Sequence, residues 1–525
     1  MNLDESLDGK LYGNGMVAAA GLLVVLTVVF FSSTVVGKKK TPPGPLPWPV
    51  VGNFLDLSVL PHRALRNLAT KYGGFMYLRL GSVPCVVIST AAVAREFVLK
   101  NDADTAGRPM VVALAILEED KTVASANPGP YWSQLRKLCH DQLFSPKRVA
   151  SYESVRTEEI HLMMKLLLKD SNKGDAVNVR RWLQGVTCNY VTRMLLGKRY
   201  FGNDEGNLEQ EQERKEFEKF YEHIFWALGT FIIDDYIPYL SFITTLQGWI
   251  PRLKEIRQFS DDIGAKLADL DKHRQRAQDR KIGEDYVPDF VDVLLTAKME
   301  DGKPLPDMNI KMILMDMLIA GIDTIANTVE WAMAELMKNP TLMKRAKDEL
   351  DEVVGLNRIV QEADIPNLPF LQAITKEALR MHPPAPLSLP HESTRPAEMF
   401  GYKLPAHTRV FYNLFAIHRD PAMYEKPDEF NPQRFIDHPE ISHLTGMDYY
   451  ELIPFGAGRR MCPAFRLGNL MVSLILAHVL HSFDWSFTEG ESAETFDMSE
   501  EFKLTVSLKK PPSWIFKPRN PAFLY

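Results

Sequence analysis

The segment FGAGRRMCPA, residues Phe455 to Ala464, constrains this chain more than any other stretch. Its single cysteine, Cys462, follows two glycines and two arginines and directly precedes an apolar run with helical spacing, Phe465 to Leu480. A thiolate that binds a metal beside a large planar group needs main-chain donors and little steric bulk, which glycines allow. We interpret these residue types as matching the requirements of thiolate ligation to a haem iron. The alternative is an ordinary turn before a helix, with a buried cysteine.

The composition of the 525-residue chain is that of a globular protein, with 46% hydrophobic and 24% charged residues. Its four cysteines are widely spaced and form no C-x-x-C pair, so neither a zinc site nor a disulfide framework is indicated. We therefore expect the body of the protein to face a reducing compartment. A net charge of -6 argues against nucleic acid as a partner.

The amino terminus reads as a retained membrane anchor. Residues 16–36 carry no charge and are long enough to cross a hydrocarbon layer of about 30 Å as a helix. Three lysines, Lys38 to Lys40, follow at once, which predicts a short luminal segment at 1–15 and a cytosolic body. A cleaved signal peptide is the competing interpretation.

A basic and proline-rich hinge over residues 37–53 is expected to follow the anchor. Prolines at the density of TPPGPLPWPVVGN exclude a helix and favour a stiff spacer over a flexible linker. Residues 54–525 are then expected to form a single catalytic domain.

The body is predicted to be mainly α-helical with small β-sheets. Short apolar runs at Met76–Leu80 and Cys85–Ser89 indicate strands around the Gly81-Ser82 turn, and Phe502–Leu508 reads as a strand. Helical spacing predicts helices over Ala91–Lys100, Tyr131–Leu143, Tyr152–Leu168, Asn178–Leu196, Gln212–Leu228, Leu253–Arg280, Asp307–Lys338, Pro340–Val354 and Leu368–Met381.

The longest predicted helix contains the sequence AGIDT, Ala320 to Thr324, inside an apolar stretch. An acid and a hydroxyl in such a helix are costly unless they form hydrogen bonds. In one account the helix opens locally here and admits dioxygen and a proton-carrying water. In the other, Asp323 faces a polar groove and the Thr324 hydroxyl donates to a carbonyl one turn earlier. The sequence leaves both accounts open.

Glu377 and Arg380 lie three residues apart on the helix that ends near Met381, so their side chains can pair. The same spacing recurs at Glu153/Arg156, Glu211/Arg214 and Glu392/Arg395, which we interpret as solvated surface. The sequence FNPQRF, residues 430–435, distinguishes Glu377, because its Arg434 can complete a buried cation–carboxylate cluster.

Trp132 and Arg136 form a Trp-x-x-x-Arg pair one helical turn apart. An indole N–H and a guanidinium on one face can hold an anionic group of a cofactor, such as a haem propionate. An amphipathic helix with a snorkelling arginine is the alternative.

Taken together and in this order, these segments resemble the cytochrome P-450 superfamily, specifically its membrane-anchored plant type. The resemblance spans the anchor, the proline-rich hinge, Trp132/Arg136, AGIDT, Glu377/Arg380, FNPQRF and the Cys462 loop. It implies a triangular prism of helices around a buried haem b with an axial thiolate. The residue roles that it implies are Cys462 as iron ligand, Phe455 as shield of the sulfur, Gly458 as close approach to the porphyrin, Arg460, Trp132 and Arg136 as propionate contacts, His391 as a further propionate candidate, Asp323 and Thr324 as proton relay, and Glu377, Arg380 and Arg434 as structural brace.

Three positions depart from the family pattern. Ala464 stands where the family usually has glycine, Ile325 where a second hydroxyl residue is common, and Gln433 where glutamate is usual. Ala464 and Gln433 are compatible with haem binding, whereas Ile325 affects the expected details of proton delivery.

The resemblance predicts a haem-thiolate monooxygenase in the endoplasmic reticulum membrane, single-pass, with its catalytic domain in the cytosol. It would use O2 and electrons from NADPH through a flavoprotein reductase, contact membrane lipid, and hydroxylate a small hydrophobic or aromatic substrate of phenolic, flavonoid or amino-acid-derived type. The substrate chamber is expected from residues 108–126, 217–228, 318–324, 385–389 and 503–506, where Phe220, Phe225 and Trp226 could stack on an aromatic ring. The alternatives are a haem-thiolate lyase or isomerase acting on hydroperoxides without a reductase, and a non-catalytic membrane haem protein.

Overall fold

The computed structural model describes residues 41–119, 121–202, 208–279, 288–299, 302–441, 444–447, 449–521 and 524. The predicted luminal segment 1–15, the anchor 16–36 and the lysines before residue 41 lie outside these residues. The described part of the hinge, residues 41–53, contains no helix, as its prolines require.

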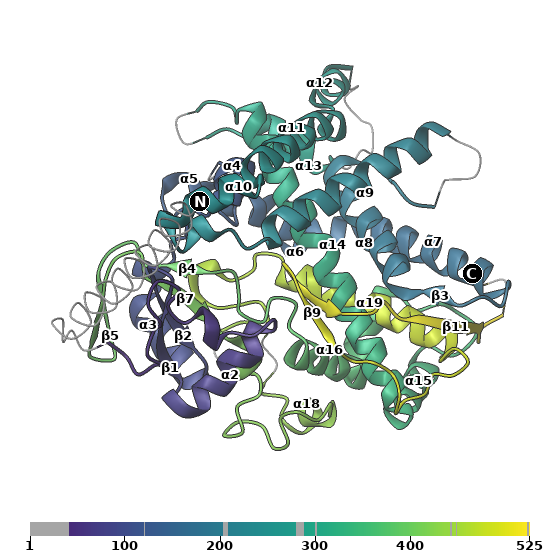
Figure 1. The fold of residues 1–525 in the computed structure, drawn as a ribbon. Coiled ribbons are helices and arrows are strands. Elements are labelled where there is room, and N and C mark those ends of the chain that lie inside the picture. Colours follow the sequence, from purple (N-terminus) through teal and green to yellow (C-terminus); the bar gives the residue numbers. More distant parts are fainter. Residues whose placement is uncertain are drawn as a thin grey trace, which may run out of the picture.

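Helices make up most of the described chain (Figure 1). The α-helices of the first half are α2 (Pro61–Tyr72), α3 (Ala91–Thr105), α4 (Val112–Leu117), α5 (Pro130–Cys139), α6 (Pro146–Ser151), α7 (Glu153–Ser171), α8 (Val179–Leu196), α9 (Leu208–Gly229), α10 (Ser241–Leu246) and α11 (Trp249–Ala268). Those of the second half are α12 (Leu270–Asp279), α13 (Phe290–Thr296), α14 (Asp307–Lys338), α15 (Pro340–Val353), α16 (Pro369–Met381), α17 (Leu414–Ile417), α18 (Gln433–Asp437) and α19 (Phe465–Ser482). Short 3-10 or π turns lie at Phe54–Asp56, His140–Phe144, Ile233–Asp235, Pro238–Leu240, Glu362–Asn367 and Gly458–Arg460.

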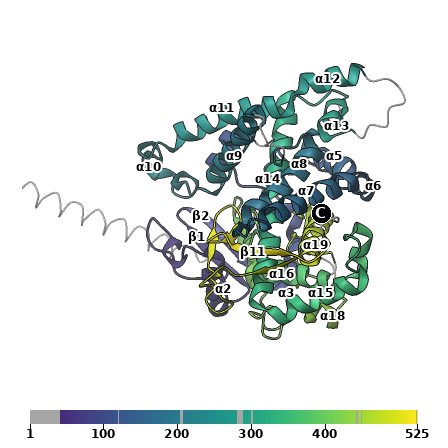
Figure 2. The same cartoon turned by 90° about the vertical axis from the view of Figure 1, so that its right-hand side faces the viewer.

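The strands form four small sheets. Their bounds are β1 (Phe75–Leu80), β2 (Val83–Ile88), β3 (Val177–Asn178), β4 (His391–Glu392), β5 (Ala397–Met399), β6 (Tyr402–Leu404), β7 (Arg409–Tyr412), β8 (Phe483–Ser486), β9 (Glu500–Phe502), β10 (Val506–Leu508) and β11 (Ser513–Pro518). The largest sheet has the order β1-β2-β7-β4, with β2 and β7 parallel. It lies beside α2 and α3 at one side of the molecule, whereas α9 to α12 lie along the top in both views (Figures 1 and 2).

Helix α14 is the central element of the helical part, and its bounds agree with the predicted range. It packs with α8, α16 and α19 in the largest apolar core. Both α14 and α19 are long and apolar enough to span a membrane, but 72% of the apolar window of each is buried inside the protein. Their apolar side chains are therefore explained by packing in the protein core.

Two predicted elements are divided in the structure. The helix expected over Leu253–Arg280 is broken at Asp269, whose φ of 37° lies in the left-handed region and cannot continue a right-handed helix. The strand expected over Phe502–Leu508 is the hairpin of β9 and β10, closed by a hydrogen bond from Lys503 N–H to the Thr505 carbonyl (3.2 Å). The apolar pattern of this segment predicted one continuous strand, because it does not show where the chain reverses direction.

The predicted brace forms. Glu377 and Arg380 are both fully buried on α16 and make two hydrogen bonds of 2.7 and 2.8 Å to each other. Arg434 Nε donates to Glu377 Oε1 at 3.1 Å, and the Asn431 N–H donates to the same oxygen at 2.8 Å. One carboxylate therefore pairs with two guanidinium groups, which leaves this cluster with a net positive charge.

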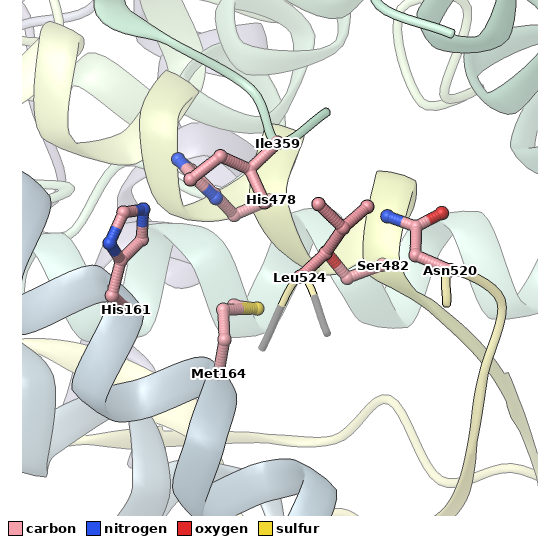
Figure 3. A pocket seen from close by; sticks show the side chains of 7 residues that line it. All are labelled: His161, Met164, Ile359, His478, Ser482, Asn520 and Leu524. Carbon is pink, nitrogen blue, oxygen red and sulfur yellow. The ribbon is translucent and has the colours of Figure 1, made fainter. Parts of the chain in front are cut away.

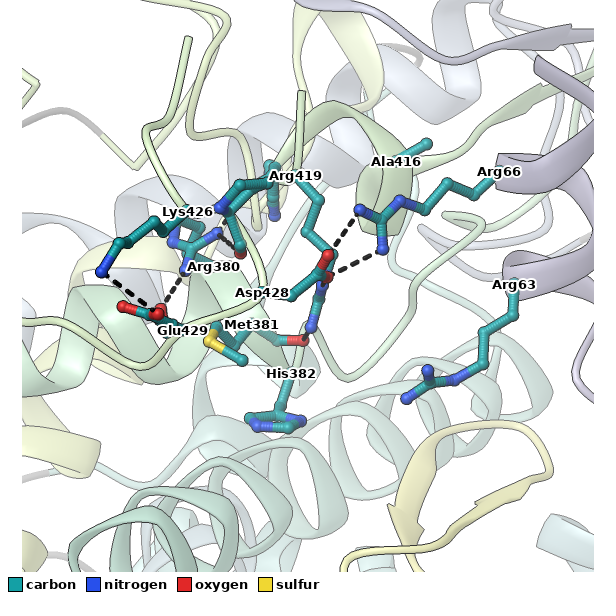
Figure 4. Close-up of polar contacts among 12 residues, drawn as sticks. Arg63, Arg66, Arg380, Met381, His382, Ala416, Arg419, Lys426, Asp428 and Glu429 are labelled. Atoms are coloured by element: carbon teal, nitrogen blue, oxygen red, sulfur yellow. Dashed lines mark hydrogen bonds and ion pairs between the residues drawn. The ribbon is translucent and has the colours of Figure 1, made fainter. Parts of the chain in front are cut away.

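The brace also fixes the loop that follows α17. Arg380 donates to the carbonyl oxygens of His418, Pro427 and Glu429 at 2.8, 2.7 and 3.2 Å. In the same loop, Asp428 accepts from both Nη atoms of Arg66 on α2, and its carboxylate lies 3.2 Å from Arg419 Nε (Figure 4).

In the part of the chain that the structure describes, the arginines of the other pairs with Glu–Arg spacing have different partners, and the surface interpretation is wrong for Arg156. This side chain is fully buried and makes a two-pronged ion pair with Glu362, 206 residues away. Arg214 pairs with Glu218, and Arg395 pairs with Asp104. Spacing along a helix identifies possible pairs, but the tertiary neighbours decide which are made.

Exchange of Glu377 for Gln should lower the free energy of unfolding by about 3–5 kcal/mol, because it leaves two inward-facing guanidinium groups without their carboxylate. Unfolding in urea, followed by far-UV circular dichroism, measures this. The control is Asp348→Asn, which removes an exposed i,i+4 pair with Lys344 and should change the value by less than about 0.5 kcal/mol. Equal effects of both exchanges would contradict the brace.

Candidate functional site

The Cys462 loop folds back on itself before α19 begins. The Cys462 N–H donates to the Phe455 carbonyl at 2.9 Å, which closes the loop around the turn Gly458–Arg460. Burial raises the pKa of the Cys462 thiol, while the Ala464 backbone and the positive charge of Arg136 act in the opposite direction. The loop thus presents one thiol at the start of an apolar helix, with a cation near enough to favour its thiolate form.

The Phe455 ring lies against the first turn of α19. A Cβ at Gly468 would be 3.4 Å from the ring edge, and the Phe465 ring centre is 6.4 Å away. A side chain at position 468 would therefore only be in ordinary contact with this ring, so the packing of Phe455 does not require glycine there.

Gly458 is required for a reason inside the protein. Its φ is +67°, and a Cβ there would lie 2.3 Å from Oδ1 of Asp102 on α3. The same carboxylate accepts the Arg459 N–H at 3.0 Å. Gly458 thus lets the cysteine loop dock on α3, apart from any approach to a cofactor.

Arg460 reaches from the loop into the segment before α5. Its guanidinium donates to the carbonyl oxygens of Ala106, Val123 and Ala126 at 2.7, 3.2 and 2.6 Å. It also lies 4.5 Å from the centre of the Trp132 ring. Two predicted cofactor contacts are therefore in direct contact with each other.

Trp132 and Arg136 face the cysteine loop from α5. The indole of Trp132 donates to the Val123 carbonyl at 3.1 Å. Arg136 Nη2 donates to the carbonyl of Met461, the residue before Cys462, at 2.5 Å. The structure thus brings the Trp-x-x-x-Arg pair and the cysteine loop together.

Arg108 joins this group and was not singled out from the sequence, where it only began the first chamber segment. It is buried, and desolvation together with the charge of Arg460 lowers its pKa to about 9. No spacing or motif marks it, so only the fold identifies it. Its guanidinium donates to the carbonyl oxygens of Ala124, Leu389 and Pro390.

His391, on β4, is buried next to the same arginines. Desolvation and the charges of Arg108 and Arg460 hold its pKa well below the usual value, so the imidazole is neutral. Its Nδ1 has no hydrogen-bond partner among the described residues. A buried ring nitrogen of this kind calls for a partner, which none of the described residues supplies.

This set of cations fits the carboxylates of a haem. The guanidinium groups of Arg108 and Arg136 make their hydrogen bonds to main-chain carbonyls among the described residues, so carboxylate oxygens would add charge-assisted bonds. The unpartnered nitrogen of His391 lies in the same charged neighbourhood. The donor set beside the thiol therefore matches a cofactor with two acidic side chains.

On α14, the helix is continuous through Ala320 to Thr324. The Thr324 hydroxyl donates to the Ala320 carbonyl at 2.8 Å, which is the second of the two accounts considered for this segment. Asp323 turns to the neighbouring helix α8, where Gln184 Nε2 donates to its Oδ1 at 2.9 Å. Burial raises the pKa of Asp323, an effect that the bond from Gln184 opposes.

The three departures from the family pattern each have a local explanation. Ala464 has φ of -97°, a conformation open to any residue, so glycine is not needed there. Ile325 is buried in the main core. Gln433 accepts from Arg345 and donates to Asp437, both at 2.7 Å, outside the brace.

The segments predicted to line the substrate chamber converge. Residues from 108–126, 217–228 and 318–324 share one apolar cluster, which includes Ala113, Leu117, Phe220, Ile224 and Ile319. Arg108 links the first segment to the Leu389 carbonyl at 2.9 Å, and the Val506 N–H donates to the Pro384 carbonyl at 2.9 Å. Segments far apart in the sequence thus meet beside α14.

The three aromatic rings singled out in this region all have protein neighbours. Phe220 is fully buried in the apolar cluster. Trp226 is covered by the Arg252 guanidinium, 3.7 Å from its ring centre, and by the Trp249 ring at 5.2 Å. Phe225 lies 4.5 Å from the Tyr221 ring on the same helix.

A separate small cavity lies between α7 and α19 (Figure 3). It is lined by His161, Met164, Ile359, His478, Ser482, Asn520 and Leu524. None of the residues discussed for the cofactor or the substrate chamber lines it. This cavity is therefore distinct from the candidate site.

Comparison with known proteins gives a consistent result. The family model described as Cytochrome P450 matches residues 42–516. Cytochrome P450 703A2 of Arabidopsis thaliana is 38% identical, covering 92% of this chain and 94% of its own length. A flavonoid 3',5'-hydroxylase of Eustoma exaltatum subsp. russellianum is 37% identical, covering 92% of both chains.

The solved structures agree in fold. A zebrafish cytochrome P450 structure with progesterone matches with a TM-score of 0.72 at 24% identity, over 87% of this chain and 99% of that one. Fold, cysteine loop, cation set and sequence relatives all lead to one conclusion: this chain belongs to the cytochrome P450 family and is a haem-thiolate monooxygenase supplied with electrons by a redox partner.

Proposed function

We propose that this monooxygenase hydroxylates a phenolic, flavonoid or amino-acid-derived small molecule in plant specialised metabolism. The observation that carries the proposal is the Asp323–Thr324 pair on α14, beside the apolar cluster in which three chamber segments meet. An acid and a hydroxyl at this place can deliver protons to a reaction that uses dioxygen and electrons. A lyase or isomerase that acts on hydroperoxides does not need such a pair. A non-catalytic protein does not need the complete cysteine loop.

The roles of the residues follow from their positions. Cys462 ligates the haem iron, and the bound haem supplies the activation of dioxygen. Arg108, Arg136, Arg460 and His391 would hold its two carboxylates. Phe455 shields the sulfur from the α19 side.

The substrate class is supported by the lining of the chamber and by the relatives. Apolar side chains from α4, α9, α11 and α14 form the cluster that faces this region. Flavonoid hydroxylases at 36–37% identity match nine-tenths of the chain. An aromatic substrate of moderate size suits such a lining.

We further propose that the enzyme lies on the cytosolic face of the endoplasmic reticulum membrane and takes electrons from an NADPH-dependent flavoprotein reductase. The support is a set of exposed apolar side chains from two segments, here called the exposed patch: Leu46, Trp48, Leu55 and Val59 from the first, and Tyr239, Phe242 and Leu246 from the second. Tyr239 donates to the Val50 carbonyl at 3.2 Å, which joins the two halves of the patch. The patch begins ten residues after position 36, where the predicted anchor ends, so the same bilayer can receive both.

Turnover with a purified NADPH-dependent reductase tests the proposed reaction. A panel of phenolic esters, flavonoids, aromatic amino acids, fatty acids and terpenoids is first screened by binding spectra, and the ligands are then assayed for hydroxylated product. We expect NADPH-dependent product from a phenolic or flavonoid member, and no thiolate-type carbon monoxide spectrum in Cys462→Ala. Conversion of a hydroperoxide without NADPH would overturn the proposal.

Removal of the Thr324 hydroxyl should uncouple the enzyme. In Thr324→Ala the haem stays bound, but electrons from NADPH are diverted to peroxide, because protons no longer arrive in an ordered way. The ratio of peroxide to product measures this. Thr328→Ala is the matched control, since its hydroxyl also donates to a carbonyl one turn earlier but lies one turn further along α14. Fully coupled turnover in Thr324→Ala would contradict the relay.

Charges in the exposed patch should weaken membrane contact. The test uses a chain that begins at residue 37 and therefore lacks the predicted anchor. With both Phe242→Glu and Leu246→Glu, this chain should bind liposomes about tenfold or more weakly than the same truncated chain without the exchanges, since two large apolar side chains no longer enter the bilayer. Co-sedimentation with vesicles measures the change. Leu99→Glu, at a residue 68% exposed on α3, is the control and should have little effect.

A further inference from the structure

Asp323 is held by a residue that no motif identifies. Gln184, in the second turn of α8, donates its amide N–H to Asp323 Oδ1 at 2.9 Å. The neighbouring Thr324 hydroxyl donates to the Ala320 carbonyl. The carboxylate of Asp323 is therefore directed toward α8.

The place of Gln184 is fixed by the packing of α8 along α14. One turn before it, Arg180 makes a two-pronged ion pair with the fully buried Glu330 of α14, at 2.9 and 3.0 Å. Further along, a Cβ at Gly321 would lie 3.0 Å from Val191 Cγ2, so glycine permits the close approach of the two helices. Gln184 is thus anchored on both sides.

The charged neighbours of Asp323 come from several elements. Arg180 on α8 and Lys503 between β9 and β10 favour the carboxylate, as does the Gln184 amide. Burial disfavours the ionised form of Asp323. The Asp323 carboxylate in turn helps raise the pKa of Tyr221 on α9 and of Glu330 on α14. A hydrogen bond from the Tyr221 hydroxyl also favours the carboxylate, and the Gln184 amide is the donor that lies 2.9 Å from its Oδ1.

We infer that Gln184 is the positioning residue of the proton relay: its amide orients the Asp323 carboxyl and stabilises the ionised form that collects a proton from the α8 side. This rests on the relay role proposed above. Asp323 binds one proton there and releases one proton toward Thr324, so the step involves no change of oxidation state. Gln184 itself touches neither substrate nor haem in this role.

The inference predicts a direction for the pH dependence. A hydrogen bond to the charged form of a carboxyl lowers its pKa, so Gln184→Leu should raise the pKa of Asp323. The loss of one bond to a charged group corresponds to a shift of about one pH unit. The midpoint at which Asp323 loses its proton therefore moves to higher pH in the variant.

Two measurements test this in the full-length, haem-loaded enzyme. Infrared difference spectra, with the Asp323 band assigned by its loss in Asp323→Asn, follow the protonated carboxyl through a pH titration. The second measurement is the fraction of NADPH electrons recovered as product, as a function of pH. We expect Gln184→Leu to shift the infrared midpoint upward by about one unit, to shift the product profile in the same direction, and to release several-fold more peroxide at neutral pH.

Matched variants separate positioning from folding. Gln212→Leu removes a glutamine amide that donates to a carboxylate, Glu216, on the exposed surface of α9, and should leave both measurements unchanged. Gln184→Asn shortens the side chain by one methylene and is expected to shift the midpoint in the same direction. It replaces the leucine variant if that variant does not fold. The thiolate-type carbon monoxide spectrum monitors an intact fold in each.

The outcomes are distinguishable. An unchanged infrared midpoint in a folded Gln184→Leu or Gln184→Asn enzyme overturns the inference. Absence of NADPH-dependent product in the wild-type enzyme overturns the proposed function, whereas the infrared titration still decides whether Gln184 controls Asp323.

Discussion

The buried ion pair of Glu377 and Arg380 is the interaction on which the cysteine loop depends. Arg380 donates to the His418 carbonyl, and the imidazole of His418 accepts the Ile453 N–H at 3.0 Å, two residues before Phe455. Burial and the neighbouring arginines lower the pKa of His418 to about 3, which keeps the ring neutral and able to accept this bond. The carboxylate of Glu377 thus acts through Arg380 and His418 on the position of Phe455 and of the loop behind it.

Much of this organisation could be predicted from sequence because it is local. The cysteine loop, the Trp132/Arg136 pair and the α16 pair each place their residues within a few positions of one another, and helix geometry brings such residues to one face. The long helix α14 was predicted with its observed bounds, because apolar spacing and the Asn339-Pro340 stop both mark it. Roles assigned through the family resemblance required the order of these segments along the chain.

What could not be predicted depends on residues brought together by the fold. Arg108 is a single arginine in an irregular segment, and only the approach of the segment before β4 and of the cysteine loop places it beside Arg460. Arg156 has the spacing of a surface pair, yet its partner Glu362 lies 206 residues away. The break at Asp269 arises from one left-handed residue, which no periodicity of apolar side chains reveals.

Helix α14 shows how one interface can serve both stability and chemistry. A buried acid in an apolar helix is stable only if it meets a partner, and α8 supplies partners for two of the acids of α14: Arg180 for Glu330 and Gln184 for Asp323. The partners differ in kind because the tasks differ. The Arg180 guanidinium opposes the burial that raises the pKa of Glu330 to about 7, whereas a neutral amide orients the carboxyl of Asp323. The same helix contact therefore anchors the core at one end and keeps a titratable group ready beside Thr324 at the other.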